Sequence, residues 1–296
     1  MFSIGKEALR EAAKKGYNSI LSNGYYIDMV QPTDFHYLND PIPVDSDLTA
    51  AEKERILGGE ATMWAELISP ETIDSRTWPR TAAIAERFWS PVHVKDVKDM
   101  YRRLDIISLQ LEELGLTHLK NQEMMLRRLV NGSDTQALKV LVDVMEPLKI
   151  YRRHEQAAYT FFSPLTRVVD AALPDAKQAR IFRQQVEDFV TGNINKEAAD
   201  VLIQDLQPWK SNHQKLMPII AGAPVLKEIE TLSRDLSRVA GIGLEAVEFI
   251  LAGKKAEPQW VDESKKVLEA AKESRGHAEL MIVPAVERLV DASMKN

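Results

Sequence analysis

Along the first 115 residues of the chain, hydrophobic positions with helical spacing alternate with short extended runs. A helical repeat over residues 6–15 ends at Gly16 and is followed by a short apolar run, which predicts a helix and then a strand. A capping box over residues 49–52 (TAAE) predicts a short second helix, which leads to an extended segment beginning near Leu57. Apolar residues at three- and four-residue spacing then predict a long helix over residues 95–114. The pattern therefore predicts alternating helices and strands.

The helical period continues through almost all of the chain after residue 117. Proline and glycine interrupt it often enough to divide it into separate helices. The pattern therefore predicts two domains, an α/β part over residues 1–116 and an all-α helical domain over residues 117–296. The predicted helices of the second domain cover residues 124–130, 135–145, 176–190, 198–209, 226–251 and 278–290.

The extended segment over residues 57–66, LGGEATMWAE, is the most informative part of the chain. Alternate side chains of a strand share a face, so a regular strand would place Trp64 and Glu66 on one face and Met63 on the other. A Trp ring stacks on the C–H face of a sugar, and a neighbouring carboxylate accepts hydrogen bonds from two hydroxyls. The pair is typical of a pyranose subsite, although a core Trp beside a surface Glu is the alternative.

A second polar pair follows the first predicted strand. Tyr26 and Asp28 have the same parity in the segment NSILSNGYYID, which covers residues 18–28. Ligands of α/β sheets and barrels bind at the carboxyl ends of the strands, so a phenol and a carboxylate emerging there favour a binding site. A hydrogen-bonded loop anchor is the alternative interpretation of this pair.

Four segments, taken in order, resemble the C-terminal part of the catalytic barrel of β-N-acetylhexosaminidases, glycoside hydrolase family 20. They are SNGYYID, DPIP, GGEATMWAE and SRTWPRTAAIAERFWS, and the resemblance covers roughly residues 1–115. It implies a TIM (β/α)₈ barrel, of which this chain carries the seventh and eighth strands and a remnant of the sixth near residues 2–4. The expected fold is mostly α with a small α/β part: the last two or three βα units of a barrel followed by an all-α helical domain.

The resemblance also implies an activity and a role for each candidate residue. The family removes terminal β-linked N-acetylhexosamine with retention of configuration and uses the 2-acetamido group of the substrate as the nucleophile. By resemblance, Tyr26 donates a hydrogen bond to the acetamide oxygen and holds it toward the anomeric carbon. Asp28 and Glu66 accept hydrogen bonds from sugar hydroxyls, and Trp64 forms a wall of the pocket. All four are substrate-binding residues, and Tyr26 also positions the acetamide.

The chain departs from the family pattern at the catalytic groups. The family's HxGGDE segment, whose Asp orients the acetamide and whose Glu is the general acid, does not occur in the sequence. The adjacent pair Asp262-Glu263 lies in the polar start of a predicted helix, where a carboxylate complements the helix dipole. Ser3-Ile-Gly5 replaces the usual Trp-containing SWxG, and the family's sugar-binding Arg comes from an earlier strand. We therefore expect no catalytic residue in this chain, and no hydrolysis by the isolated chain.

Composition narrows the classes of partner. The 296 residues carry 38 basic and 44 acidic side chains, a net charge of -6, and no cysteine. Basic clusters are short and mixed with acids, so we expect no nucleic acid partner. No apolar run is long enough to span a membrane, no histidines have metal-ligand spacing, and no cofactor motif occurs. We expect a soluble chain without a signal peptide, whereas the resemblance implies a periplasmic or secreted parent enzyme.

Other interpretations remain open at this point. The chain is alternatively a non-catalytic carbohydrate- or protein-binding helical module with a vestigial barrel remnant. An N-terminal half of the same enzyme is a further expected partner, besides the N-acetylhexosamine-containing glycan. Trp209 and Trp260 fit core packing or a sugar groove, and residues 151–154 (YRRH) fit a solvated helix face.

Overall fold

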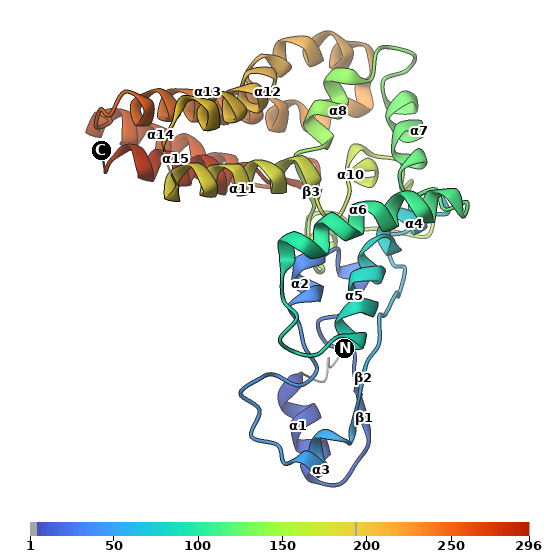
Figure 1. Cartoon of the computed structure of the whole chain (residues 1–296). Coiled ribbons are helices and arrows are strands. Elements are labelled where there is room, and N and C mark those ends of the chain that lie inside the picture. Colours follow the sequence, from blue (N-terminus) through green and yellow to red (C-terminus); the bar gives the residue numbers. More distant parts are fainter. Residues whose placement is uncertain (1–4, 193, 296) are drawn as a thin grey trace. The chain divides into compact units, whose positions relative to one another are not determined.

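The computed structural model describes residues 5–192 and 194–295, and Figure 1 shows its elements. The chain is mostly helical with few strands, as predicted, and divides into two compact units. Unit 1 consists of Met1–Asn121 with Lys149–Tyr151, and unit 2 of Gln122–Leu148 with Arg152–Asn296. The predicted remnant of a sixth strand near residues 2–4 lies outside the described residues.

Unit 1 alternates short helices with two parallel strands. Gly16 has φ +90° and ends the first helix, and Thr49 and Glu52 form the predicted capping box. The first core cluster of the unit gathers α1, β1 and α5 around Leu9 and Ile84. The elements are α1 Lys6–Lys14, β1 Ser19–Leu21, η1 Ile27–Met29, α2 Thr33–Tyr37, α3 Ala50–Lys53, β2 Ile56–Gly59, α4 Ile73–Thr77, α5 Arg80–Trp89 and α6 Val97–Glu113.

The predicted strand over residues 57–66 is shorter than expected. Regular pairing ends with β2 at Gly59, and only one isolated bridge, Tyr26 to Thr62, continues it. The backbone turns into the left-handed region at Ala65, whose φ of +60° is incompatible with a strand. A strict two-face alternation through Glu66 is therefore wrong.

Unit 2 packs its helices around one large core. The longest, α12, runs through Pro208 and Pro218 well beyond the predicted residues 198–209, because its buried face continues at helical spacing to Ile220. The elements of unit 2 begin within α7 Lys120–Leu129. They continue with α8 Gln136–Val142, β3 Met145–Pro147, α9 Arg152–Gln156, α10 Val168–Ala171, α11 Lys177–Thr191, α12 Lys196–Gly222, η2 Pro224–Ile229, α13 Glu230–Leu251, α14 Pro258–Ala271, β4 Ala278–Leu280 and α15 Val283–Ser293.

The region predicted to be entirely helical contains a small antiparallel ladder. Strands β3 and β4 pair Met145 with Leu280 and Pro147 with Ala278. Both fall inside or at the ends of segments predicted as helices, because short apolar runs have the same composition in a buried strand and a buried helix. The final helix begins only at Val283.

The two tryptophans of unit 2 pack against neighbouring rings. Trp209 is buried and its ring centroid lies 4.9 Å from that of Phe182. Trp260 lies 5.0 Å from Phe249, and its Nε1 donates to Glu245 Oε2 at 2.5 Å. Core packing therefore accounts for both residues. None of the helices in residues 5–192 and 194–295 combines the length and apolar character that crossing a membrane requires.

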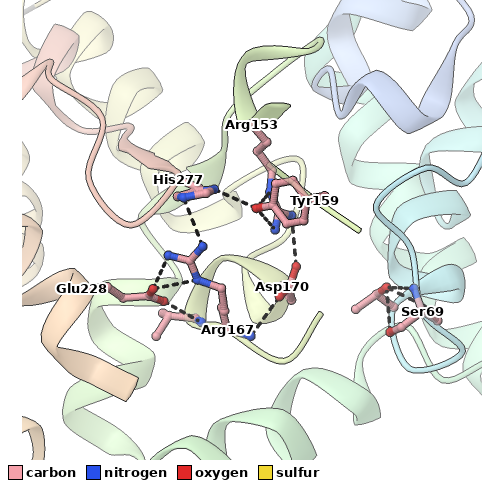
Figure 2. Close-up of polar contacts among 9 residues, drawn as sticks. Ser69, Arg153, Tyr159, Arg167, Asp170, Glu228 and His277 are labelled. Atoms are coloured by element: carbon pink, nitrogen blue, oxygen red, sulfur yellow. Dashed lines mark hydrogen bonds and ion pairs between the residues drawn. The ribbon is translucent and has the colours of Figure 1, made fainter. Parts of the chain in front are cut away.

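A buried polar network ties the segment around α10 to β4 and η2 (Figure 2). Arg153 donates to Asp170 at 3.0 Å and forms a salt bridge in which both side chains are almost fully buried. Arg167 pairs with Glu228 and also donates to His277 Nε2 at 3.1 Å. Each charge thus has an opposite partner, which burial of charged groups requires.

The contacts of His277 define its protonation state. Arginine has no acceptor, so the Arg167 contact requires an unprotonated Nε2 on His277. The proton therefore resides on Nδ1, which donates to the Tyr159 hydroxyl at 2.8 Å. Burial, with the Arg167 and Arg153 charges, lowers the pKa of His277 to about 4, and Asp170 opposes this only in part. His277 is neutral in the folded chain at neutral pH.

We predict that unit 2 loses stability as the pH falls from about 6.5 toward about 4. Between these pH values His277 binds a proton in the unfolded chain, where its pKa is about 6.5, but stays neutral in the folded chain. The difference corresponds to about 3 kcal/mol at most. His277→Asn removes the titrating imidazole and should reduce the slope of the unfolding free energy against pH, measured by chemical denaturation. Asn is chosen because it tolerates the φ of +65° at this position. An unchanged slope in His277→Asn contradicts the prediction.

Candidate functional site

The site is assembled where β1 and β2 end. The two strands pair in parallel, with Leu21 opposite Gly59. Pairing resumes past the strands, where Thr62 N donates to Tyr25 O and Ile27 N donates to Thr62 O, both at 2.9 Å. Both chain segments therefore leave the sheet at the same edge, and their next residues lie side by side.

Gly59 makes this close approach possible. A Cβ at this position would meet the ring of Phe88 at 2.5 Å and the carbonyl oxygen of Leu21 at 3.0 Å. A larger residue would push β2 away from β1 and from α5. The second glycine of the GGEA segment is thus required by packing beneath the site.

The Asp28 carboxylate joins the two segments directly. Its Oδ2 accepts a hydrogen bond from the Trp64 backbone N–H at 3.0 Å. Its Oδ1 is buried and receives no hydrogen bond within the described part of the chain. Burial raises the pKa of Asp28, while the Trp64 amide and the adjacent backbone amides oppose that rise, as does the charge of Arg80. A buried carboxylate oxygen without a donor carries a desolvation cost that no hydrogen bond offsets.

Trp64 is held at its backbone but its ring is largely exposed. The side chain is 56% exposed, whereas the preceding Met63 packs on the first core cluster of unit 1. The sequence thus predicted the opposite placement of Met63 and Trp64 correctly, although the regular strand is absent. An exposed indole fixed at its main chain provides a flat apolar surface for stacking.

Tyr26, Asp28 and Glu66 gather around one further residue. Burial raises the pKa of the Tyr151 phenol, and its electrostatic interactions with Glu66, Asp28 and Tyr26 add to this in that order. All three groups must lie within electrostatic range of the Tyr151 hydroxyl. These three candidate residues and Tyr151 all belong to unit 1, and Tyr151 lies within their electrostatic range.

Two residues of this region were not identified from the sequence. Tyr151 was assigned to a solvated helix face, because nothing in its local pattern distinguishes it from its neighbours. Arg80 is 2% exposed and donates to Ile27 O at 2.8 Å, to Gln31 O at 2.7 Å and to Arg76 O. The only sequence signal for Arg80 was its place in the SRTWPRTAAIAERFWS segment.

Arg80 fixes the loop that carries the candidate residues. Its guanidinium reaches the carbonyls on both sides of the Asp28 turn, so the turn cannot move without breaking these charge-assisted bonds. Its positive charge also acts on the Asp28 carboxylate. We find no group of histidines and carboxylates suited to a metal ion in the part of the chain that is described.

Comparison with known proteins places the N-terminal region in a family. Residues 3–92 match the family described as glycosyl hydrolase family 20, catalytic domain. The chain is similar to the beta-hexosaminidase subunit beta of Felis catus, with 32% identity over 114 residues that cover 38% of this chain and 21% of the relative. The same subunit of Homo sapiens is 32% identical over 111 residues, which cover 37% of this chain and 20% of the relative.

A solved structure resembles nearly the whole chain. The X-ray structure of a chitobiase from Flavobacterium johnsoniae has a TM-score of 0.87 and 39% sequence identity, and the match covers 96% of this chain and 43% of that one. The chain thus spans about a fifth of the length of the curated relatives and less than half of the chitobiase. The resemblance to a hexosaminidase-like hydrolase inferred from the sequence motifs is confirmed: residues 3–92 match the catalytic domain of glycosyl hydrolase family 20, and the relatives that the chain resembles are hexosaminidases and a chitobiase.

Proposed function

We propose that this chain is the C-terminal part of a β-N-acetylhexosaminidase and that Tyr26, Asp28, Trp64 and Glu66 bind a terminal N-acetylhexosamine. The hydrogen bond from the Trp64 amide to the Asp28 carboxylate carries the proposal, because it links the two segments of the sugar motif. An exposed indole beside carboxylates and a phenol is a suitable surface for a pyranose ring and its hydroxyls.

In the proposed reaction the substrate supplies its own nucleophile. The acetamide oxygen attacks the anomeric carbon, and the glycosidic oxygen leaves with a proton from a general acid. Tyr26 donates to the acetamide oxygen and keeps it on its line of attack, which is a positioning role. Asp28 and Glu66 accept hydrogen bonds from sugar hydroxyls, and Trp64 limits the pocket.

The proposal assigns the catalytic Asp-Glu pair to residues outside this sequence. Asp262-Glu263 lies on the exposed side of α14, where Gln259 Nε2 donates to Glu263 Oε1 at 3.0 Å. This pair belongs to unit 2 and its local environment is that of a solvated helix start. The isolated chain is thus a sugar-binding part of a hydrolase rather than a complete catalyst.

The proposal also assigns each of the two parts of the chain to a domain of the parent enzyme. Residues 1–116 are the last two or three βα units of a (β/α)₈ barrel, and residues 117–296 are a helical accessory domain. The match to the chitobiase over 96% of the chain supports this, because it extends through the helical residues. A periplasmic or secreted parent enzyme agrees with a glycan substrate outside the cytoplasm.

An incomplete sheet supports the same assignment. Ile20 of β1 is 51% exposed and Leu57 of β2 is 63% exposed, and these two strands form a sheet of two in unit 1. A cleft of about 470 Å³ beside β2 is lined by Ile42, Leu57 and Phe88 among others. Unpaired strand edges and apolar side chains of this kind require cover, and the earlier strands of a barrel would provide it.

We predict that the chain binds N-acetylglucosamine weakly and does not hydrolyse its glycosides. Loss of a general acid alone costs roughly 10²- to 10⁴-fold in rate. Binding is measured by calorimetric titration, which does not depend on the Trp64 side chain as a reporter, and hydrolysis with a chromogenic N-acetyl-β-glucosaminide. Trp64→Ala should abolish binding, with Trp89→Ala as a control, because Trp89 is also exposed but lies at the end of α5.

Three outcomes distinguish the alternatives. Turnover by the chain alone would reveal a catalytic carboxylate within it and refute the predicted inactivity. Sugar binding that survives Trp64→Ala would reject the proposed subsite. A chain that binds no sugar but captures a specific protein partner would favour a helical interaction module with a vestigial barrel.

We predict that Asp28→Asn stabilises unit 1 while weakening sugar binding. The raised pKa of Asp28 means that its charged form is disfavoured by folding, so this charge destabilises the unit at neutral pH. Asn still accepts the Trp64 N–H without the charge. The measurement is the thermal midpoint of the chain at pH 7, together with a sugar titration.

Asp47→Asn is the matched control for Asp28→Asn. Lys14 and Arg10 lower the pKa of the exposed Asp47, so removal of that charge should leave stability equal or slightly lower. A fall in the midpoint of Asp28→Asn would show that its charge is compensated and would contradict the prediction.

We predict that activity appears when the missing strands are supplied. The remaining N-terminal portion of the Flavobacterium johnsoniae chitobiase, expressed together with this chain, should form a complex with N-acetylglucosaminidase activity. The same mixture with Trp64→Ala should lose most of that activity. If the two parts associate stably but remain inactive with the unmodified chain, the proposed assignment of its residues is wrong.

A further inference from the structure

Residues 149–151 belong to a different compact unit from the residues on either side of them. Lys149–Tyr151 packs as part of unit 1, although the residues on both sides belong to unit 2. Leu148 N donates to His277 O at 3.0 Å, and Arg152 pairs with Glu279, so both flanks are held within unit 2. The excursion is therefore confined to these three residues.

A hydrogen bond fixes this excursion beside the Asp28 turn. Ile150 N donates to Met29 O at 3.0 Å, one residue after Asp28. Ile150 adopts φ +59°, a conformation that is unfavourable for a β-branched side chain. Strained backbone of this kind persists only where the surrounding contacts enforce it, and it is concentrated at binding and active sites.

Residues 149–151 include an aromatic side chain, Tyr151, near the candidate site. Tyr151 is 40% exposed and lies within electrostatic range of Glu66, Asp28 and Tyr26. Its hydroxyl is a second phenolic donor, besides that of Tyr26, in a region that also contains two carboxylate acceptors. Its ring adds a second partly exposed aromatic surface to that of Trp64, which is 56% exposed.

We propose that Tyr151, contributed by the connection between β3 and α9, is a specificity-determining residue that contacts the bound aminosugar. The inference rests on the proposed sugar site of Tyr26, Asp28, Trp64 and Glu66. The Tyr151 hydroxyl donates a hydrogen bond at the sugar's hydroxyl face, and the ring packs against the sugar. The helical region of the chain thereby takes part in recognition rather than only in stability.

Full-chain variants test this assignment with N-acetylglucosamine as the probe and glucose as the reference ligand. Tyr151→Phe removes one neutral hydrogen bond and should weaken N-acetylglucosamine binding by roughly 2- to 10-fold. Tyr151→Ala also removes the ring and should weaken it by more than about tenfold. Dissociation constants are obtained by calorimetric titration, which also applies to Trp64→Ala, and circular dichroism verifies folding.

Tyr17→Ala is the matched control, because Tyr17 is 65% exposed in the connection between α1 and β1. It should bind as the unmodified chain does. If Tyr151→Ala and Tyr151→Phe bind normally while Trp64→Ala does not, the role of Tyr151 is refuted and the proposed function stands. If the unmodified chain prefers neither sugar and binds neither, both proposals fail. Should Tyr151→Ala unfold, the Tyr151→Phe result decides.

Discussion

The hydrogen bond between the Asp28 carboxylate and the Trp64 amide is the constraint on which the site depends. Two parallel strands only three and four residues long fix the direction of their chain ends poorly. The carboxylate compensates by binding the second segment after regular pairing has ended. Its other oxygen remains buried without a donor, so the group that assembles the site also retains an unused acceptor.

That carboxylate is kept in place by groups with no direct part in recognition. Arg80 binds carbonyls on both sides of the Asp28 turn, and Gly59 allows β2 to approach Leu21 and Phe88. Burial of a charge is costly unless neighbouring groups compensate. Burial raises the pKa of Asp28 because the Trp64 amide, the adjacent backbone amides and the charge of Arg80 offset its cost only in part.

Much of the fold follows from sequence because local rules govern it. The capping box at Thr49 and the glycine stop at Gly16 depend on a few adjacent residues, and both were predicted. The predicted strand through Glu66 and the predicted start of a helix at residue 278 are wrong, because the φ of Ala65 and the pairing of β4 with β3 depend on distant contacts. Motif positions predict Tyr26, Asp28, Trp64 and Glu66 as site residues, and the structure joins the Asp28 carboxylate to the Trp64 amide. Tyr151 comes from a part of the chain that no local pattern connects to them.

The location of Tyr151 follows from the separate organisation of the two units. Unit 2 has its own core and its own buried ion-pair network, which holds the segment from Arg153 to Asp170 independently of unit 1. Because Leu148 and Arg152 are anchored there, the three intervening residues can adopt an unfavourable conformation without destabilising the larger core. A strained backbone placed between two rigid anchors is stable only as long as both anchors hold. The conformation of residues 149–151 is thus set by contacts that are distant in the sequence, which a local pattern does not reveal.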